Sequence, residues 1–298
     1  MTDRFSNCLI TVAMPVYNAG VYLRTAVLSI LNQTHLNWEL LIIDDGSTDT
    51  SLESIDDIYD PRIKLLRDHC NKGLAARLNE AVDLARGQFL ARMDGDDISY
   101  PDRFATQIAL FRSDPQLDVV SVRAITISRM NEIVGILPSP LNHAEICAKP
   151  WRGFYFPHPT WMGRIEWFRR HRYRTLFRNP ISIEDQELLL RTYRDSKFAC
   201  VPEIQFAYRI QDRILLKKRL KTRLALFRVQ TASFLTNGQY RFTLIAGVVF
   251  VLRILSDFGI FLSQLSGASS TGQSSSVLEN PATQQWGQLK RRFSPDKL

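Results

Sequence analysis

The sequence predicts an α/β fold in which a mixed, mostly parallel sheet is flanked by helices and followed by a helical C-terminal extension. Within residues 8–100, short apolar runs alternate with segments of helical apolar spacing, as in parallel sheets with helices on both faces. Three of these runs end in polar loops, at residues 15–18, 44–49 and 94–97. Because the carboxyl ends of parallel strands meet at one edge of a sheet, we expect the loops to form one ligand site.

The apolar runs give an expected order of elements. Four buried strands are expected, at residues 9–14, 39–43, 63–66 and 88–93. Helices are expected over 21–31, after the capping residues 47–49, and from about 74 to 87. The second half predicts a helix over 101–113, a strand at 119–122, a hairpin within 124–137 and a strand at 198–201.

The composition is that of a folded chain with excess positive charge. Of 298 residues, 45% are hydrophobic and 23% are charged, and the net charge is +8. This hydrophobic share supplies a sizeable core and excludes a disordered chain. The basic balance suggests an anionic partner, which is a nucleic acid, a phosphorylated substrate or a membrane surface. The four cysteines form no CxxC pair and the first eight residues are polar, which favours a reducing cytosol and predicts no signal peptide.

The acidic segment at residues 94–97 follows the fourth predicted strand. Asp94, Asp96 and Asp97 cluster there, although like charges repel and raise each other's pKa. One interpretation is a site of hard oxygen ligands for Mg²⁺ or Mn²⁺ bridging a diphosphate. The alternative is an acidic turn in which Asp97 or Ser99 caps the next helix. Because G-x-G-x-x-G and the P-loop pattern are both absent, a glycine loop is not expected to hold phosphates.

The order of four motifs resembles the family-two glycosyltransferases of GT-A fold, over about residues 8–212. The motifs are Pro-Val-Tyr-Asn at 15–18, Asp-Asp-Gly-Ser-Thr-Asp at 44–49, Asn-Lys-Gly-Leu at 71–74 with Arg77 and Asn79, and Asp-Gly-Asp-Asp at 94–97. The resemblance implies a Rossmann-like GT-A domain over 1–212. Residues 8–100 would form its nucleotide-binding half and residues 101–212 its acceptor half.

The resemblance also implies roles for single residues. Those expected at the nucleotide are Pro15 and Tyr17 at the base pocket, Asp45 accepting from the base, Asp94 near the ribose, and Arg77, while Asp96 is the expected metal ligand. Two of these have plainer alternatives: Tyr17 as a packing residue and Arg77 as a solvated helix charge.

A second acidic pair, Glu184 and Asp185, precedes a segment of helical spacing in the acceptor half. Carboxylates at a helix N-terminus also serve as caps. The resemblance implies instead that the pair is the catalytic motif, with Asp185 as the base of an inverting transfer. His158 is a candidate acceptor-site residue, with a structural hydrogen-bonding role as the alternative. Gln211 stands where many relatives carry a metal-ligating His, and we do not expect it to be a ligand.

The C-terminal part divides into a basic helix, an apolar segment and a tail. Residues 213–228 mix Lys and Arg with apolar residues, and residues 244–262 have the length of a membrane span. Arg253 and Asp257 are expected to pair one turn apart on this segment. An interfacial or re-entrant helix, a true span and a helix packed on the soluble domain are all compatible with the pattern. If the segment spans, the basic residues before it predict that the domain lies on the cytoplasmic face, and residues 264–298 predict a disordered tail.

Together these features predict an inverting, metal-dependent glycosyltransferase. The expected donor is a nucleotide sugar, most simply a UDP-sugar, and the expected acceptor is a hydroxyl of a saccharide or a lipid-linked oligosaccharide in cell-surface polysaccharide biosynthesis. A polyprenyl-phosphate sugar transferase and a non-catalytic nucleotide-sugar-binding protein are the alternatives. A nucleic-acid partner is not expected, because no recognition motif accompanies the high pI.

Overall fold

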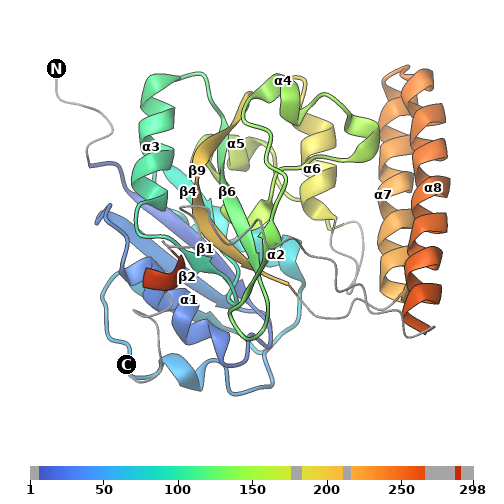
Figure 1. The fold of residues 1–298 in the computed structure, drawn as a ribbon. Helices are drawn as coiled ribbons and strands as arrows, with labels where there is room; N and C mark the ends of the chain where they lie inside the picture. Colours follow the sequence, from blue (N-terminus) through green and yellow to red (C-terminus); the bar gives the residue numbers. More distant parts are fainter. Residues whose placement is uncertain (1–6, 176–182, 211–215, 266–285, 290–298) are drawn as a thin grey trace.

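The structure is a computed structural model that describes residues 7–175, 183–210, 216–265 and 286–289 (Figure 1). Within these ranges nine strands form one sheet, in the order β3-β2-β1-β4-β8-β6-β9-β5, with β7 paired to β6 beside this path. The strands are β1 (Ile10–Val16), β2 (Trp38–Asp44), β3 (Ile63–Arg67), β4 (Phe89–Arg92), β5 (Ile98–Ser99), β6 (Val119–Ile127), β7 (Ile133–Ile136), β8 (Met162–Arg164) and β9 (Phe198–Arg209).

Helices cover both faces of the sheet. They are α1 (Tyr22–Leu31), α2 (Leu74–Leu84), α3 (Arg103–Ser113), α4 (His143–Ile146), α5 (Ile165–Arg170), α6 (Glu184–Thr192), α7 (Leu216–Thr236) and α8 (Tyr240–Leu265), with 3-10 turns η1 (Glu53–Ile55), η2 (Pro150–Arg152) and η3 (His158–Thr160). Alternate residues of β1, β2 and β4 pack on α1 and α3 on one face, and on α2, α5 and α6 on the other. This arrangement confirms the predicted fold class.

The N-terminal half has the predicted parallel core. Strand β1 pairs in parallel with β2 and β4, and β2 pairs in parallel with β3. All seven residues of both β1 and β2 are buried, as continuous apolar runs predict for central parallel strands. The carboxyl ends of β1, β2 and β4 therefore deliver the three polar loops to one edge of the sheet.

The second half adds antiparallel pairing that makes the sheet mixed. The three-residue strand β8 joins β4 to β6, antiparallel to both. Strand β9 pairs in parallel with β6 and antiparallel with β5. The buried Arg103 guanidinium braces this junction, because its Nη2 donates to the carbonyls of Arg92 (2.7 Å), Pro159 (3.2 Å) and Trp161 (3.3 Å).

Some expected elements differ in the structure. The helix expected after residues 47–49 is the single 3-10 turn η1, and the loop before it is held by contacts between Asp49 and Ser51. Strand β9 continues through Arg209, well beyond the expected end at residue 201, because β6 and β5 both pair with it. The helix-cap alternative for the acidic segment is wrong: Ser99 lies in β5, and the N-cap of α3 is Asp102.

Helices α7 and α8 form an antiparallel hairpin along one side of the domain (Figure 1). The expected pairing of Arg253 with Asp257 is wrong. Asp257 instead faces α7, where its carboxylate oxygens lie 3.2 Å from Arg223 Nε and 3.6 Å from Arg219 Nη1. Arg253 Nη2 donates to the backbone carbonyl of Arg152, 2.8 Å away. Partners on neighbouring elements are closer than the partner one turn along the same helix.

Residues 286–289 of the predicted tail form a helical turn against the sheet. The Trp286 ring stacks on Tyr100, and its Nε1 donates to the Asn131 carbonyl at 3.2 Å. The remaining tail residues, 266–285 and 290–298, lie outside the described ranges, as does Gln211.

Candidate active site

Two adjoining pockets open at the edge of the sheet where the polar loops meet. The first, with a volume of about 260 Å³, is lined by Pro15, Val16, Tyr17, Asn18, Ala19, Asp45, Leu74, Asp94, Gly95 and Asp96. The second, of about 470 Å³, is lined by Leu74, Arg92, Asp94, Leu137, Pro138, the 154–159 segment, Glu184, Asp185, Gln186 and Tyr208. Leu74 and Asp94 belong to both walls. The structure thus brings Pro15, Tyr17, Asp45, Asp94, Asp96, Glu184, Asp185 and His158 into one composite site.

The first pocket is shaped by contacts between the loops after β1 and β2. Asn18, which has a positive φ of 52°, receives the backbone N–H of Thr48 on its Oδ1 at 2.8 Å. Asp49 Oδ2 accepts from the backbone N–H of Gly20, also at 2.8 Å. With these loops fixed, Tyr17 keeps 53% of its surface exposed on the pocket wall, so it is not a core-packing residue.

Asp45 and Arg77 form the buried support of this pocket. Asp45 accepts from the backbone N–H groups of Lys72 (2.7 Å) and Gly73 (3.0 Å), and from Arg77 Nε at 2.9 Å. Arg77 is 1% exposed and also pairs with Asp68 and Glu80, so the solvated-charge alternative is wrong. The structure places Arg77 beneath Asp45, away from the pocket wall, where it positions that carboxylate.

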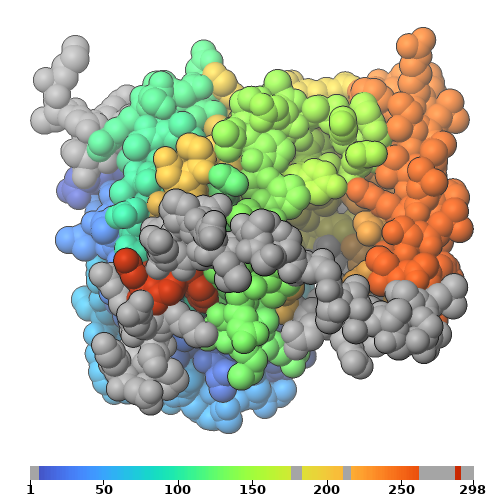
Figure 2. All heavy atoms as spheres, in the orientation of Figure 1, coloured from blue at the N-terminus to red at the C-terminus, as the bar shows by residue number. Residues whose placement is uncertain are grey.

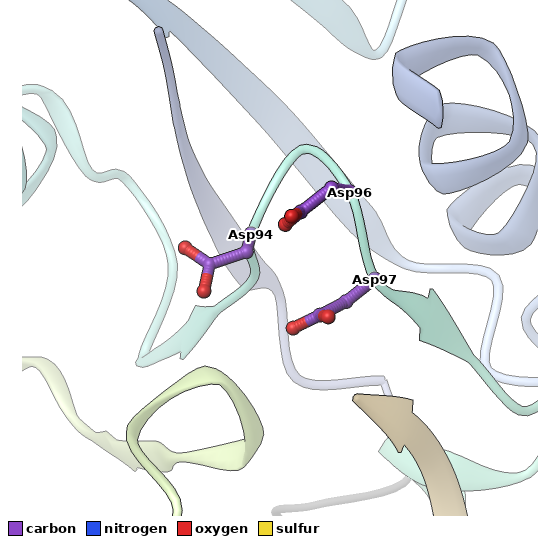
Figure 3. A group of neighbouring side chains, drawn as sticks. All are labelled: Asp94, Asp96 and Asp97. Atoms are coloured by element: carbon purple, nitrogen blue, oxygen red, sulfur yellow. The ribbon is translucent and has the colours of Figure 1, made fainter. Parts of the chain in front are cut away.

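The acidic loop that follows β4 carries three carboxylates side by side. Figure 3 shows Asp96 and Asp97 pointing to the side of the loop on which Asp94 lies, and one oxygen from each of the three falls within 4.8 Å of the others. The loop is tied to the end of β9: Asp97 Oδ1 accepts the backbone N–H of Arg209 at 2.7 Å, and Arg209 Nε donates to the Asp96 carbonyl at 2.7 Å. This cross-link fixes the spacing of the acids.

The electrostatics of the loop suit a divalent cation. Burial, with the neighbouring charge of Asp94, raises the pKa of Asp96 to about 6, and burial raises the pKa of Asp97 well above its usual range. Asp97 Oδ2 is buried, and none of the described groups hydrogen-bonds to it. A hard cation would satisfy that oxygen and offset the repulsion among the acids, so the donor set fits Mg²⁺ or Mn²⁺.

A buried arginine that sequence analysis missed links the two pockets. Arg92, the last residue of β4, is 3% exposed and donates from both terminal nitrogens to Asp94, at 2.6 Å each. Its guanidinium lines the second pocket, where it lies within electrostatic range of Glu184. The sequence did contain a signal for this role: a charged residue, Arg92, ends an otherwise apolar strand just before the acidic segment.

The acids of the second pocket begin helix α6. The N-cap of that helix, Ile183, makes no side-chain cap, and Glu184 and Asp185 stand in the first turn, where the helix dipole favours negative charge. Burial raises the pKa of Asp185, although His158 and the hydrogen bonds of Gln186 act in the opposite direction. Gln186, also missed from the sequence, donates to Asp185 Oδ2 at 3.1 Å and to the Phe154 carbonyl at 3.2 Å. It therefore orients the candidate base against the pocket wall.

His158 lies at the base of the second pocket and is buried. Its Nε2 is 2.9 Å from the Tyr173 hydroxyl, and its Nδ1 is 3.6 Å from Glu184 Oε1. Burial, with the nearby Arg92 charge, lowers the pKa of His158 to about 3, so the ring is neutral at physiological pH. This geometry supports the plainer alternative, a structural hydrogen bond, which His158 makes with Tyr173.

Comparison with known proteins places this site in a family. The sequence model of "Glycosyl transferase family 2" matches residues 11–172. EpsE of Bacillus subtilis, named as a glycosyltransferase, is 35% identical over 190 residues, which are 62% of this chain and 67% of that protein. The Escherichia coli protein named UDP-Glc:alpha-D-GlcNAc-diphosphoundecaprenol beta-1,3-glucosyltransferase is 39% identical over 102 residues, 34% of this chain and 40% of its own length.

Solved structures share the fold at low sequence identity. A mannosyltransferase from Pyrobaculum calidifontis, in complex with GDP-Man and Mn²⁺, aligns over 95% of this chain and 84% of its own, with a TM-score of 0.59 and 16% identity. Staphylococcus aureus TarS in complex with UDP covers 76% of this chain and 65% of its own, with a TM-score of 0.57 and 16% identity. The matched family model, which spans the loops of the first pocket and the acidic loop, shows that the chain belongs to glycosyltransferase family 2.

Proposed function

We propose that this glycosyltransferase moves a sugar from a UDP-sugar to a hydroxyl of a lipid-linked saccharide, with inversion at the anomeric carbon and with a divalent cation. The observation that carries the proposal is the shared wall of the two pockets. Asp94 belongs to both, with the cation-suited acids on one side and Asp185 on the other. A donor and an acceptor can therefore meet at this wall with a carboxylate beside the acceptor.

The roles of the residues follow from this placement. Pro15, Tyr17 and the supported Asp45 would hold the nucleoside, and Asp94 and Asp96 would face the ribose and the diphosphate. Asp185 would accept the proton of the acceptor hydroxyl as its oxygen bonds to the anomeric carbon and the bond to the leaving diphosphate breaks. Asp96 would hold a divalent cation, which would supply charge stabilisation to the leaving diphosphate.

The charge of the second pocket favours a hydroxyl acceptor over a lipid phosphate. Glu184, Asp185 and Asp94 line it, His158 is neutral, and Arg92 is the one Arg or Lys among the described wall residues. Since Arg92 is already paired with Asp94, a phosphate nucleophile would face uncompensated carboxylates. A hydroxyl, in contrast, needs the base that Asp185 offers.

A UDP donor and a lipid-linked acceptor are supported by two relatives and by the hairpin. The E. coli relative is named for UDP-Glc and a diphosphoundecaprenol-linked sugar, and TarS is solved with UDP. Helix α8 is long and apolar enough to cross a membrane, and only 11% of its most apolar 18-residue stretch is buried inside the protein. The basic helix α7 precedes it. Together with basic α7, such a helix suits a protein at the cytoplasmic face of a membrane.

A donor screen tests the nucleotide and the cation together. Thermal unfolding is measured with a panel of UDP- and GDP-sugars, each with and without Mn²⁺. We expect a UDP-sugar to raise the Tm only when Mn²⁺ is present. Stabilisation by GDP-sugars alone, or an equal rise without the cation, would contradict the proposed donor or the proposed metal dependence.

Substitution of the base tests the chemistry. Asp185→Asn keeps the shape of the side chain but removes the proton acceptor, so turnover should fall between about 100- and 10,000-fold. UDP binding, measured by calorimetry, should stay unchanged. Unchanged turnover would show that Asp185 is not the base, and lost UDP binding would show a structural role.

A further inference from the structure

A cluster of arginines lies where the α7–α8 hairpin meets the second pocket. Arg152 belongs to η2, Arg219 and Arg223 to α7, and Arg253 to α8. Arg253 donates to the Arg152 carbonyl, and Arg223 and Arg219 flank Asp257. Asp257 pairs with two of these four arginines, so among the described residues the cluster keeps excess positive charge.

A single loop joins this cluster to the catalytic acids. We call residues 150–156 the bridging loop. At one end, Gln230 of α7 donates to the Pro150 carbonyl at 2.8 Å. At the other, Gln186 Oε1 accepts the Phe154 N–H at 2.8 Å, beside Asp185. Figure 2 shows the hairpin, in orange, against the lime-green segment that contains this loop.

Tyr155 of the bridging loop belongs both to the pocket and to the cluster. It lines the second pocket and is 51% exposed, and it lies within electrostatic range of Arg253. Arg253 is in turn within electrostatic range of Arg152 and Arg223. The pocket mouth therefore opens onto guanidinium groups, although its interior is acidic.

The exposed apolar residues of α8 lie on the side of the helix away from Arg253. Val248, Leu252, Leu255 and Phe258 each expose more than two fifths of their surface, and they share a helix with Arg253. The structure therefore presents an acidic sugar-sized pocket, a cationic cluster beside it and an exposed aliphatic surface on the outer side of α8.

We infer that the cluster of Arg152, Arg223 and Arg253 binds the diphosphate of a lipid-linked acceptor, whose sugar enters the second pocket and whose lipid lies along α8. This inference rests on the proposed function, and it names the group by which the acceptor is recognised. Guanidinium forks match phosphate oxygens in geometry and in charge. The acidic pocket would reject the same diphosphate, so the two charges set the orientation of the acceptor.

Binding of farnesyl diphosphate tests the cluster without knowledge of the sugar. Calorimetry is done on the full chain with excess UDP and Mg²⁺, so that the donor pocket is filled, and farnesol serves as the uncharged probe. Arg253→Gln should weaken farnesyl diphosphate binding about tenfold, since a charged hydrogen bond is lost, and leave farnesol binding unchanged. Arg152→Gln, at an exposed side chain, should do the same if Arg253→Gln fails to fold.

Arg228→Gln is the matched control, because it removes one exposed arginine from α7 outside the cluster. It should not change farnesyl diphosphate binding. Equal loss in both variants, or no loss in either, would overturn the inference.

Vesicles of phosphatidylglycerol and phosphatidylcholine supply the other source of phosphate. Selective loss of vesicle binding in Arg253→Gln, with farnesyl diphosphate binding unchanged, would show a headgroup site and would also overturn it. Either failure leaves sugar transfer and UDP binding intact, so it is distinct from failure of the proposed function.

Discussion

Asp185 lies in surroundings that oppose its ionisation, yet its proposed role needs the ionised form. Burial raises its pKa, while the Gln186 side chain donates to Oδ2 and limits the rise. An acid with a raised pKa is also a stronger base once it is ionised. The burial that raises the pKa of Asp185 therefore also supports proton transfer to this carboxylate near neutral pH.

The pH profile should report this raised pKa. A base works only when deprotonated, so kcat/KM should fall as the pH drops through the pKa of Asp185. The midpoint should lie above the roughly 3.9 of an unperturbed aspartate. The measurement is kcat/KM for the acceptor against pH, at saturating donor and cation. A profile that stays flat down to pH 4 would contradict the proposed base.

Arg77 shows how a residue can matter to the donor pocket without lining it. It is buried with Asp45, and removing one partner leaves a buried, uncompensated charge. Arg77→Met should lower the free energy of unfolding by about 3 kcal/mol. Urea unfolding measures the change, with Arg169→Met at the exposed pair with Glu166 as the control, for which less than about 1 kcal/mol is expected. Equal effects of the two substitutions would contradict this account.

At the scale of elements, the parallel half was predictable and the antiparallel strand β8 was not. Strands β1, β2 and β4 are specified by their own apolar runs, which end in loops of readable turn residues. Strand β8 has three residues and acquires its conformation from β4 and β6 on either side. Gly163 lies in it because an added Cβ would come within 2.7 Å of the Phe168 ring, a contact that local sequence does not reveal.

The residues that line the site could be predicted from the sequence, whereas the residues that hold the lining residues in position could not. Tyr17, Asp94 and Asp185 stand at strand ends or helix starts, the positions where ligands are expected. The roles of Arg92 and Gln186 depend on residues of other elements as well, because Arg92 lies near Glu184 and Gln186 bonds to Phe154. The ion-pair partners of Asp257 also come from another element, because Arg219 and Arg223 of α7 lie closer to its carboxylate than the arginine of its own helix does.

The bridging loop depends on Gly153. This residue has φ of +82°, and an added Cβ would lie 2.8 Å from Gln186 Oε1. Gly153→Ala should therefore displace Gln186 and lower kcat about tenfold. This loss of activity comes in addition to a loss of stability of roughly 1–2 kcal/mol, which the backbone strain of any such substitution causes. Gly238→Ala is the control, because Gly238 has φ of +67° but no atom within 4 Å of an added Cβ. If both substitutions lower kcat equally, the loop does not position the base.

At the scale of the whole molecule, the α7–α8 contacts bear on the proposed membrane association, because they suit a helix in the membrane interface better than a helix that spans the bilayer. Asp257 is held by two arginines of α7, so a spanning α8 would lose these contacts or draw charged α7 into the bilayer. An interfacial hairpin keeps the contacts and still buries the exposed leucines and valines of α8 in lipid.

Charges on the exposed face of α8 should release the protein from vesicles. Leu252→Asp with Leu255→Asp removes two side chains that are 60% and 62% exposed, so the fold should tolerate the change. Binding to phosphatidylglycerol vesicles should weaken at least tenfold, because each buried leucine contributes about 1.5–3 kcal/mol. Flotation measures binding, and Tyr59→Asp, at an exposed residue outside the hairpin, should leave it unchanged. Undiminished flotation would contradict the interfacial surface.

The cross-link between the acidic loop and the end of β9 has a consequence for how the enzyme comes into being. Asp97 and Arg209 are 112 residues apart, and β5 has β9 as its partner. During synthesis the nucleotide loops of β1 and β2 can assemble early, because their contacts are near in sequence, whereas the carboxylates after β4 take their final spacing only when residue 209 has left the ribosome. If the loop binds a cation as proposed, a nascent chain cannot hold it in the mature geometry until β9 is in place.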